Sequence, residues 1–131
     1  MDKKEMFLTY VKTNVAPILE DFIFGKDLKD AVVLPADLKR EELTGHYEGE
    51  EYLPPVWYTK LPKDNTPKLL VIDNIDTISK EEQIKFGEIL KYRKVSTFEL
   101  PKNCVIVVTA KDISDKTINE EIFSLVARIW G

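Results

Sequence analysis

Continuous runs of apolar residues in the second half of the chain predict two buried β-strands. The runs cover residues 68–72 (KLLVI) and 104–109 (CVIVVT). Neither run alternates between apolar and polar positions, a pattern typical of parallel strands that are covered on both faces. Helical patterns follow both runs, and strand–helix alternation favours right-handed crossovers. The sequence therefore predicts a single-domain α/β protein, a three-layer sandwich with a mostly parallel sheet.

Two capping signals predict where the helices of this half begin. Ser79 opens the stretch SKEE, in which Glu82 completes a capping box. Thr117 opens the stretch TINE and pairs in the same way with Glu120. The second helix should extend to Ile129, because apolar residues recur at helical spacing as far as that position.

The first 24 residues are predicted to form a helical segment and a short strand. Apolar residues recur at helical spacing at Phe7, Tyr10, Val11, Val15, Ile18, Leu19 and Phe22. Pro17 should kink this helix or begin a second one, because its ring removes a hydrogen-bond donor. The short apolar runs 22–24 and 31–34 are interpreted as buried strands.

Residues 43–67 are predicted to form a long loop, since four prolines interrupt them. A connection of this length is unusual in a compact domain unless it has a role. Its aromatic residues, Trp57 among them, could form a lid over the core or a contact surface for a partner. The lid is favoured, because aromatic side chains are usually buried.

Composition excludes several classes of function. The net charge of -4 provides no basic surface for nucleic acid, so that partner is not expected. Apolar runs are too short for a membrane span, and the N-terminus has no secretion signal. Cys104 is the one cysteine and is interpreted as a small buried apolar residue. These features favour a cytoplasmic protein.

Polar residues follow both predicted strands, at the edge where parallel sheets bind ligands. Asp73, Asn74 and Asp76 follow the first strand, and Thr109 and Lys111 lie at the end of the second. An acid in this position can hold Mg²⁺ on the phosphates of a nucleotide. The same residue types also occur here simply as helix caps.

Four sequence blocks resemble the ATPase core of AAA+ proteins, in the MoxR-like and dynein-related branch. They are DLKREELTGHY, LLVIDNID, the stretch from IKFGEIL to VIVVTAKD, and INEEIFSLVARI, and together they span residues 37–128. The second block resembles a Walker B strand, the third a sensor 1 strand, and the fourth the helix that carries an arginine finger. The resemblance implies a P-loop NTPase-like fold, with ATP and Mg²⁺ as the family's cofactors.

Four positions in these blocks have a role in the family, and two of them carry the family's residue in this chain. Asp73 corresponds to the Walker B aspartate that holds Mg²⁺, and Arg128 to the finger that reaches a neighbouring subunit. Asn74 stands where the family has a glutamate that polarises water, and Lys111 where it has the sensor 1 asparagine. A neutral amide cannot act as a general base. Lys111 is interpreted as a partner of Asp73 or Asp76 that replaces the lost cation.

The phosphate-binding motif G-x-x-x-x-G-K-[ST] is missing from the sequence. Its nearest counterpart is EDFIFGKD, residues 20–27, in which Glu20 and Phe24 occupy glycine positions and Asp27 replaces the hydroxyl. The lid domain that follows this core in the family is also expected to be absent.

These features predict a non-hydrolysing AAA+-like interaction or regulatory module without a cofactor. Its partner would be a protein, an active AAA+ ATPase ring for example, contacted through Arg128 and Trp57. One alternative is an ATP-binding protein with weak or conditional ATPase activity, in which Lys26 or Lys111 replaces the P-loop lysine. Another is a fragment of a larger ATPase.

Overall fold

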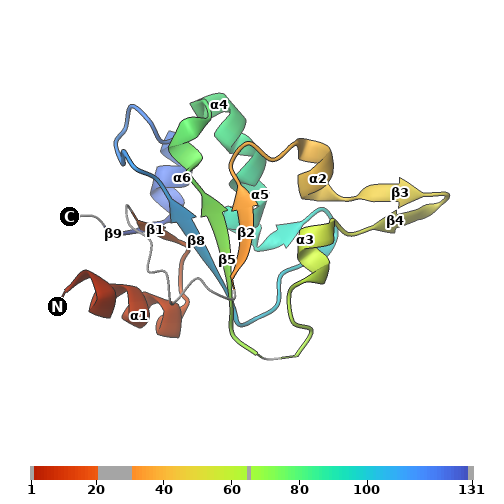
Figure 1. The fold of residues 1–131 in the computed structure, drawn as a ribbon, viewed down its shortest axis with the longest axis horizontal. Coiled ribbons are helices and arrows are strands. Elements are labelled where there is room, and N and C mark those ends of the chain that lie inside the picture. The colour runs from red at the N-terminus through yellow and green to blue at the C-terminus, as the bar shows by residue number, and fades with distance from the viewer. Residues whose placement is uncertain (1, 21–30, 65, 130–131) are drawn as a thin grey trace.

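A five-stranded, all-parallel sheet forms the centre of the molecule (Figure 1). The computed structural model describes residues 2–20, 31–64 and 66–129. The strands are β1 (Ile18–Glu20), β2 (Val32–Pro35), β5 (Lys68–Asp73), β8 (Cys104–Thr109) and β9 (Ala127–Ile129). Their order across the sheet is β2-β5-β8-β1-β9, and every neighbouring pair is parallel. The predicted α/β class and parallel sheet are confirmed.

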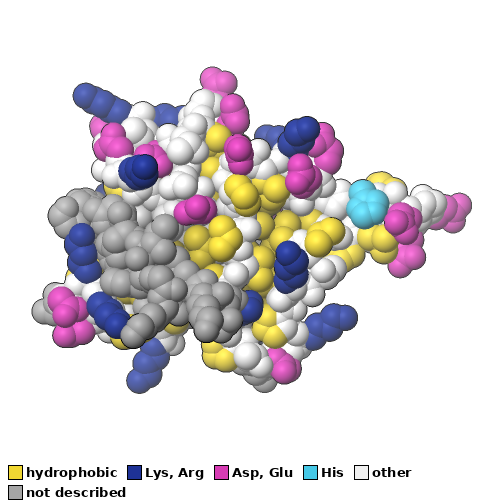
Figure 2. All heavy atoms as spheres, in the orientation of Figure 1, with side chains coloured by type: hydrophobic (Ala, Val, Ile, Leu, Met, Phe, Trp, Pro, Cys, Tyr) yellow, Lys and Arg dark blue, Asp and Glu magenta, His cyan; other side chains and the backbone are white. Residues whose placement is uncertain are grey.

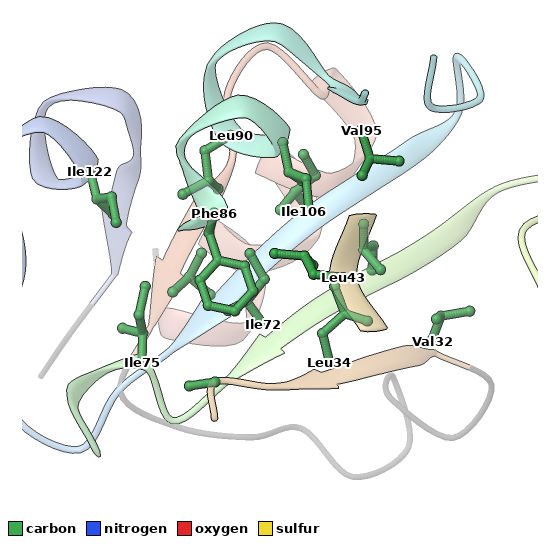
Figure 3. Close-up of a cluster of buried hydrophobic side chains, with 14 of the residues drawn as sticks. Val32, Leu34, Leu43, Ile72, Ile75, Phe86, Leu90, Val95, Ile106 and Ile122 are labelled. Atoms are coloured by element: carbon green, nitrogen blue, oxygen red, sulfur yellow. The ribbon is translucent and has the colours of Figure 1, made fainter. Parts of the chain in front are cut away.

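Helices cover both faces of this sheet and complete three layers. On one face, Phe7 of α1 (Lys3–Thr13) packs with Val71 and Val107. On the other face, Phe86 and Leu90 lie over Ile72 and Ile106, as Figure 3 shows. This second layer contains α4 (Lys80–Gln83), α5 (Gly87–Tyr92) and α6 (Glu120–Leu125). A short 3₁₀ turn at Ile75–Thr77 leads from β5 toward α4, and another at Ile84–Phe86 joins α4 to α5.

The predicted strands 68–72 and 104–109 are present as β5 and β8. All six residues of β8 are buried, as expected for a strand with a helical layer on each side. The run 31–34 corresponds to β2, where buried and exposed residues alternate because this strand forms one edge of the sheet. The run 22–24 lies outside the described residues.

The predicted helix over the first 22 residues is wrong beyond Thr13. Asn14 adopts the left-handed conformation, with φ of 47°, and its backbone N–H bonds to the Tyr10 carbonyl, which ends α1. Ile18 and Leu19 are fully buried in β1, which lies between β8 and the edge strand β9. The spacing of Ile18 and Leu19 fits a helix equally well. They form a strand because their side chains are buried on opposite faces of the sheet.

The last predicted helix begins and ends differently from the prediction. Asn119, and not Thr117, is the N-cap, and its side chain accepts a hydrogen bond from the Glu121 N–H at 2.9 Å. The helix ends at Leu125, and residues 127–129 form the edge strand β9. The capping signal at Ser79 is confirmed, because its hydroxyl accepts from the Glu82 N–H at 3.2 Å.

Residues 43–67 are not a featureless loop. After α2 (Arg40–Thr44) they form a hairpin of β3 (His46–Glu48) and β4 (Glu51–Leu53), then the short helix α3 (Val56–Thr59). The hairpin projects from the body of the molecule in Figure 1. Further along the chain, β6 (Lys94–Val95) and β7 (Phe98–Glu99) form a second, smaller hairpin.

Gly45 gives a test of this arrangement. Its φ is 92°, and a Cβ there would lie 2.3 Å from the Leu53 carbonyl oxygen, so we expect Gly45→Ala to destabilise the fold by about 2 kcal/mol. Gly87 lies in α5 with open space around it, so Gly87→Ala should stabilise the fold by about 0.5–1 kcal/mol. Urea unfolding of both variants measures the change in unfolding free energy. Changes of the same sign in the two variants would contradict the prediction.

Cys104 gives a second test, through pH. It is buried in β8, and burial raises the pKa of its thiol to about 11, although Arg93 nearby favours the thiolate. The unfolded chain loses this proton near pH 9, so the contribution to stability is complete below pH 9 and lost as pH rises toward 11. Between pH 9 and 11, wild-type stability should therefore fall more steeply than that of Cys104→Ala. Parallel curves would contradict the assignment.

Candidate functional site

The carboxyl ends of three strands bring Asp73, Thr109 and Glu20 into one row. Ile72 of β5 pairs with Val108 of β8, so the next residues, Asp73 and Thr109, also lie side by side. Glu20, the last residue of β1, pairs with Thr109 on its other side. The sequence predicted Asp73 and Thr109 at this edge, but it gave no sign that Glu20 ends a strand beside them.

The hydroxyl of Thr109 is the central group of this row. It donates to Asp73 Oδ1 at 2.7 Å and accepts from the Asn74 N–H at 2.9 Å. The Asn74 side chain donates to Asp73 Oδ2 at 3.2 Å. Each oxygen of the Asp73 carboxylate therefore accepts a hydrogen bond from within the chain, and Thr109 itself is 3% exposed.

Asn74 fits its position for a conformational reason. Its φ of 59° and ψ of 51° place it in the left-handed region, which asparagine tolerates better than most residues. The carbonyl of Asn74 also accepts from the Thr77 hydroxyl at 2.7 Å. The residue thus forms the turn that leads from β5 into the next helix, and its amide is used to hold Asp73.

Lys111 does not pair with Asp73 or Asp76, contrary to the prediction. Within the described residues it is exposed and makes no ion pair with either acid. Asp76 instead accepts from the Asp112 N–H at 3.0 Å. Both acids are held by other donors, and Lys111 remains in solvent.

Gln83 is a residue of this region that sequence analysis missed. Its side chain is fully buried, and its Nε2 donates to the carbonyls of Ile75, Ile78 and Thr117 at 3.2, 3.3 and 2.8 Å. Its Oε1 accepts from the Asn119 N–H at 2.7 Å. The sequence signal was a glutamine at a position of the predicted helix that faces the core. Its hydrogen-bond partners could not be identified from sequence, because those at Thr117 and Asn119 are more than 30 residues away.

Arg128 lies on a different strand from Asp73, Thr109 and Glu20. It belongs to β9, beside Leu19 of β1, and its guanidinium carbon is 4.8 Å from the centre of the Phe123 ring. The sequence placed Arg128 on a helix, which is wrong. Two strands, β8 and β1, separate β9 from β5, so Arg128 and Asp73 do not form one site within this chain.

Trp57 is part of the core on the other side of the molecule. Its side chain is 6% exposed, and its indole Nε1 donates to the Leu43 carbonyl at 3.0 Å. It packs with the residues beneath α2 and α3, as the lid interpretation implies. Contact of Trp57 with a partner stays a prediction.

The described residues are a poor fit for a bound metal. In them, no group of three or more His, Cys, Asp or Glu side chains could hold a metal ion. Asp73 is the candidate ligand, and both of its oxygens already accept hydrogen bonds. Of the stretch 20–27, the described part is Glu20 alone, so the phosphate-loop counterpart lies outside the described residues.

Comparisons with known proteins show a likeness of fold. No family model and no curated protein matches the sequence. A crystal structure of NtrX from Brucella abortus is similar, with a TM-score of 0.58 and 15% identity over 97% of this chain. The chain spans 35% of that structure's chain. The protein is therefore an α/β protein with an all-parallel sheet that resembles part of NtrX. In the described part of the chain, none of the helices is long and apolar enough to cross a membrane.

Thr109 gives a direct test of the edge network. Thr109→Val keeps the shape but leaves the Asn74 N–H and one Asp73 oxygen without their partner, which should cost about 2–3 kcal/mol of unfolding free energy. Thr109→Ser keeps the hydroxyl and should cost less than about 1 kcal/mol, chiefly from the lost methyl group. Denaturant unfolding compares the two, and equal losses would show that the hydroxyl has no such role.

Proposed function

We propose that the chain is a non-hydrolysing, AAA+-like interaction module whose nucleotide site has become a structural hydrogen-bond network. One observation carries the proposal. Both oxygens of the Asp73 carboxylate accept hydrogen bonds from Thr109 and Asn74. In the resembled family this aspartate would face Mg²⁺, whereas here it joins the ends of two strands.

Electrostatics around Thr109 supports the same conclusion. Asp73 and Glu20 lie next to Thr109 on the two neighbouring strands, and Glu20 is completely buried. A nucleotide triphosphate is strongly anionic, and like charges at short range repel most where water is excluded. Lys111, two residues after the end of β8, remains exposed and makes no ion pair with Asp73 or Asp76 within the described residues.

The position that holds the general base for hydrolysis in the resembled family is occupied here by a neutral amide. Asn74 occupies the position after Asp73, and an amide does not take a proton from water. One hydrogen of its side-chain NH2 is used for the bond to Asp73. The proposed function of such a module is therefore protein–protein contact, with an AAA+ ATPase ring as the partner.

Calorimetric titration with ATP, with and without Mg²⁺, tests the loss of the nucleotide site. We expect no heat of binding and no phosphate release. Asp73→Ala should lower stability without changing this result, because the acid serves the fold. Mg²⁺-dependent binding of about micromolar affinity, some 8 kcal/mol, that disappears in Asp73→Ala would contradict the proposal and favour a conditional ATPase.

The proposed partner face around Arg128 has its own test. Cross-linking in native extract, followed by mass spectrometry, should join the wild-type chain to an AAA+ ATPase. Arg128→Ala should reduce this product, whereas Lys12→Ala, an exposed cation on α1, should not. Equal cross-linking by both variants would place the contact elsewhere on the module.

A further inference from the structure

We propose that the groove bordered by β2, α2 and α3 binds a partner segment that carries lysine or arginine beside apolar side chains. The groove has a volume of about 340 Å³, and Val33, Leu38, Glu41, Glu42, Val56 and Trp57 are among its lining residues. It is separate from the edge network and from Arg128. The inference therefore goes beyond the proposed function.

Apolar side chains on the walls of this groove are open to solvent. Val33 on β2 is 49% exposed, and Val56 at the start of α3 is 71% exposed. Figure 2 shows hydrophobic side chains gathered in the middle of this face, over β2, α2 and α3. Clustered exposure of large apolar side chains at a hollow is typical of contact surfaces.

The groove has a firm base. The Trp57 ring is fixed by its hydrogen bond to the carbonyl of Leu43, a residue of α2 whose side chain is itself buried. A preformed wall lowers the ordering cost of binding, because its side chains need not be immobilised when the partner arrives. The groove is thus suited to receive side chains without rearrangement.

Strand addition at this edge is an unsuitable mode of binding. β2 is the outer strand and has four residues, the last of which, Pro35, lacks an N–H. The Pro35 carbonyl is also taken, since it accepts from the Leu38 N–H at 3.0 Å. Recognition must therefore use side chains in the groove more than backbone pairing with β2.

The charges at the groove identify the partner's chemistry. Glu41 and Glu42 line it together with Lys60 and His46. The adjoining hairpin places Glu48 directly opposite Glu51, and acidic side chains crowd the projecting hairpin in Figure 2. Like charges directly opposite each other destabilise a hairpin. His46 Nε2 lies 3.6 Å from Glu48 Oε1, and a cationic side chain of the partner near Glu51 would relieve the remaining repulsion. An apolar and basic segment complements both features.

The position of the groove makes it independent of the Arg128 face. β2 and β9 are the opposite edges of the same sheet, with β5, β8 and β1 between them. A partner in the groove would not compete with a partner at Arg128. Such a module could hold two proteins at once.

The probe for this groove is a short peptide of leucine and lysine, compared with its leucine–glutamate counterpart. Binding is measured by ¹⁵N NMR titration of the full chain. We expect shift changes confined to β2, α2, α3 and the β3–β4 hairpin with the lysine peptide. Shifts spread over the whole surface, equal binding of the glutamate peptide, or no shift at millimolar peptide would each overturn the proposal.

Two double variants distinguish binding at the groove from attraction of the peptide by acidic residues in general. Glu41→Gln/Glu42→Gln removes two charges from the first turn of α2 and should weaken binding about tenfold at low salt. Glu81→Gln/Glu82→Gln removes two charges from the first turn of α4 and should leave binding unchanged. Equal effects of the two pairs would show non-specific attraction.

Two further variants complete the design. Val56→Ser should weaken binding without loss of fold, because this side chain is mostly exposed. Arg128→Ala should bind the peptide like the wild type, so a failure of the groove and a failure of the proposed Arg128 contact give different results. Unchanged affinity in Val56→Ser, or loss of affinity in Arg128→Ala, would contradict a separate groove.

Discussion

The buried side-chain amide of Gln83 joins the two loops that leave the carboxyl edge of the sheet. Its four hydrogen bonds reach the turn after β5 at Ile75 and Ile78, and the start of α6 at Thr117 and Asn119. Without the amide, the carbonyls of Ile78 and Thr117 and the N–H of Asn119 would lose these hydrogen bonds, each at a cost of about 1–3 kcal/mol where the group stays buried, whereas the Ile75 carbonyl would keep its bond from the Ile78 N–H. The clamp therefore fixes where α6 begins, and α6 leads directly into β9 and Arg128.

Thr109 has the corresponding role on the opposite face of the sheet. Its hydroxyl joins β5 to β8 at a level where the backbone ladder ends, because Asn74 turns into the left-handed region. This bond is a sufficient physical reason for an acid at position 73, because the buried Thr109 hydroxyl needs an acceptor within reach. An acid after an apolar strand is thus compatible with two roles, metal ligand and internal acceptor, and its hydrogen-bond partners distinguish them.

Sequence reasoning succeeded where one local signal decided the structure. Continuous apolar runs identified β5 and β8, and the Ser79 hydroxyl caps the helix that it was expected to cap. It failed where distant contacts decide. The segment containing Ile18 fits a helix or a three-residue strand equally well, and pairing with β8 and β9 selects the strand. The bonds of Gln83 and the isolation of Lys111 from Asp76 likewise follow only from the folded arrangement.

The sheet also determines how separate surfaces of the module relate to one another. Val33 and Arg128 lie on its two edge strands, and the three strands between them are joined by backbone hydrogen bonds and packed on both faces. A sheet packed on both faces does not deform easily, because a close-packed protein interior has low compressibility. Any two partners at these edges would be held at a fixed separation. The hydrogen bonds of Thr109 and Gln83 tie the loops at the carboxyl edge to this sheet, so the framework between the two edge strands is fixed by side chains as well as by the backbone.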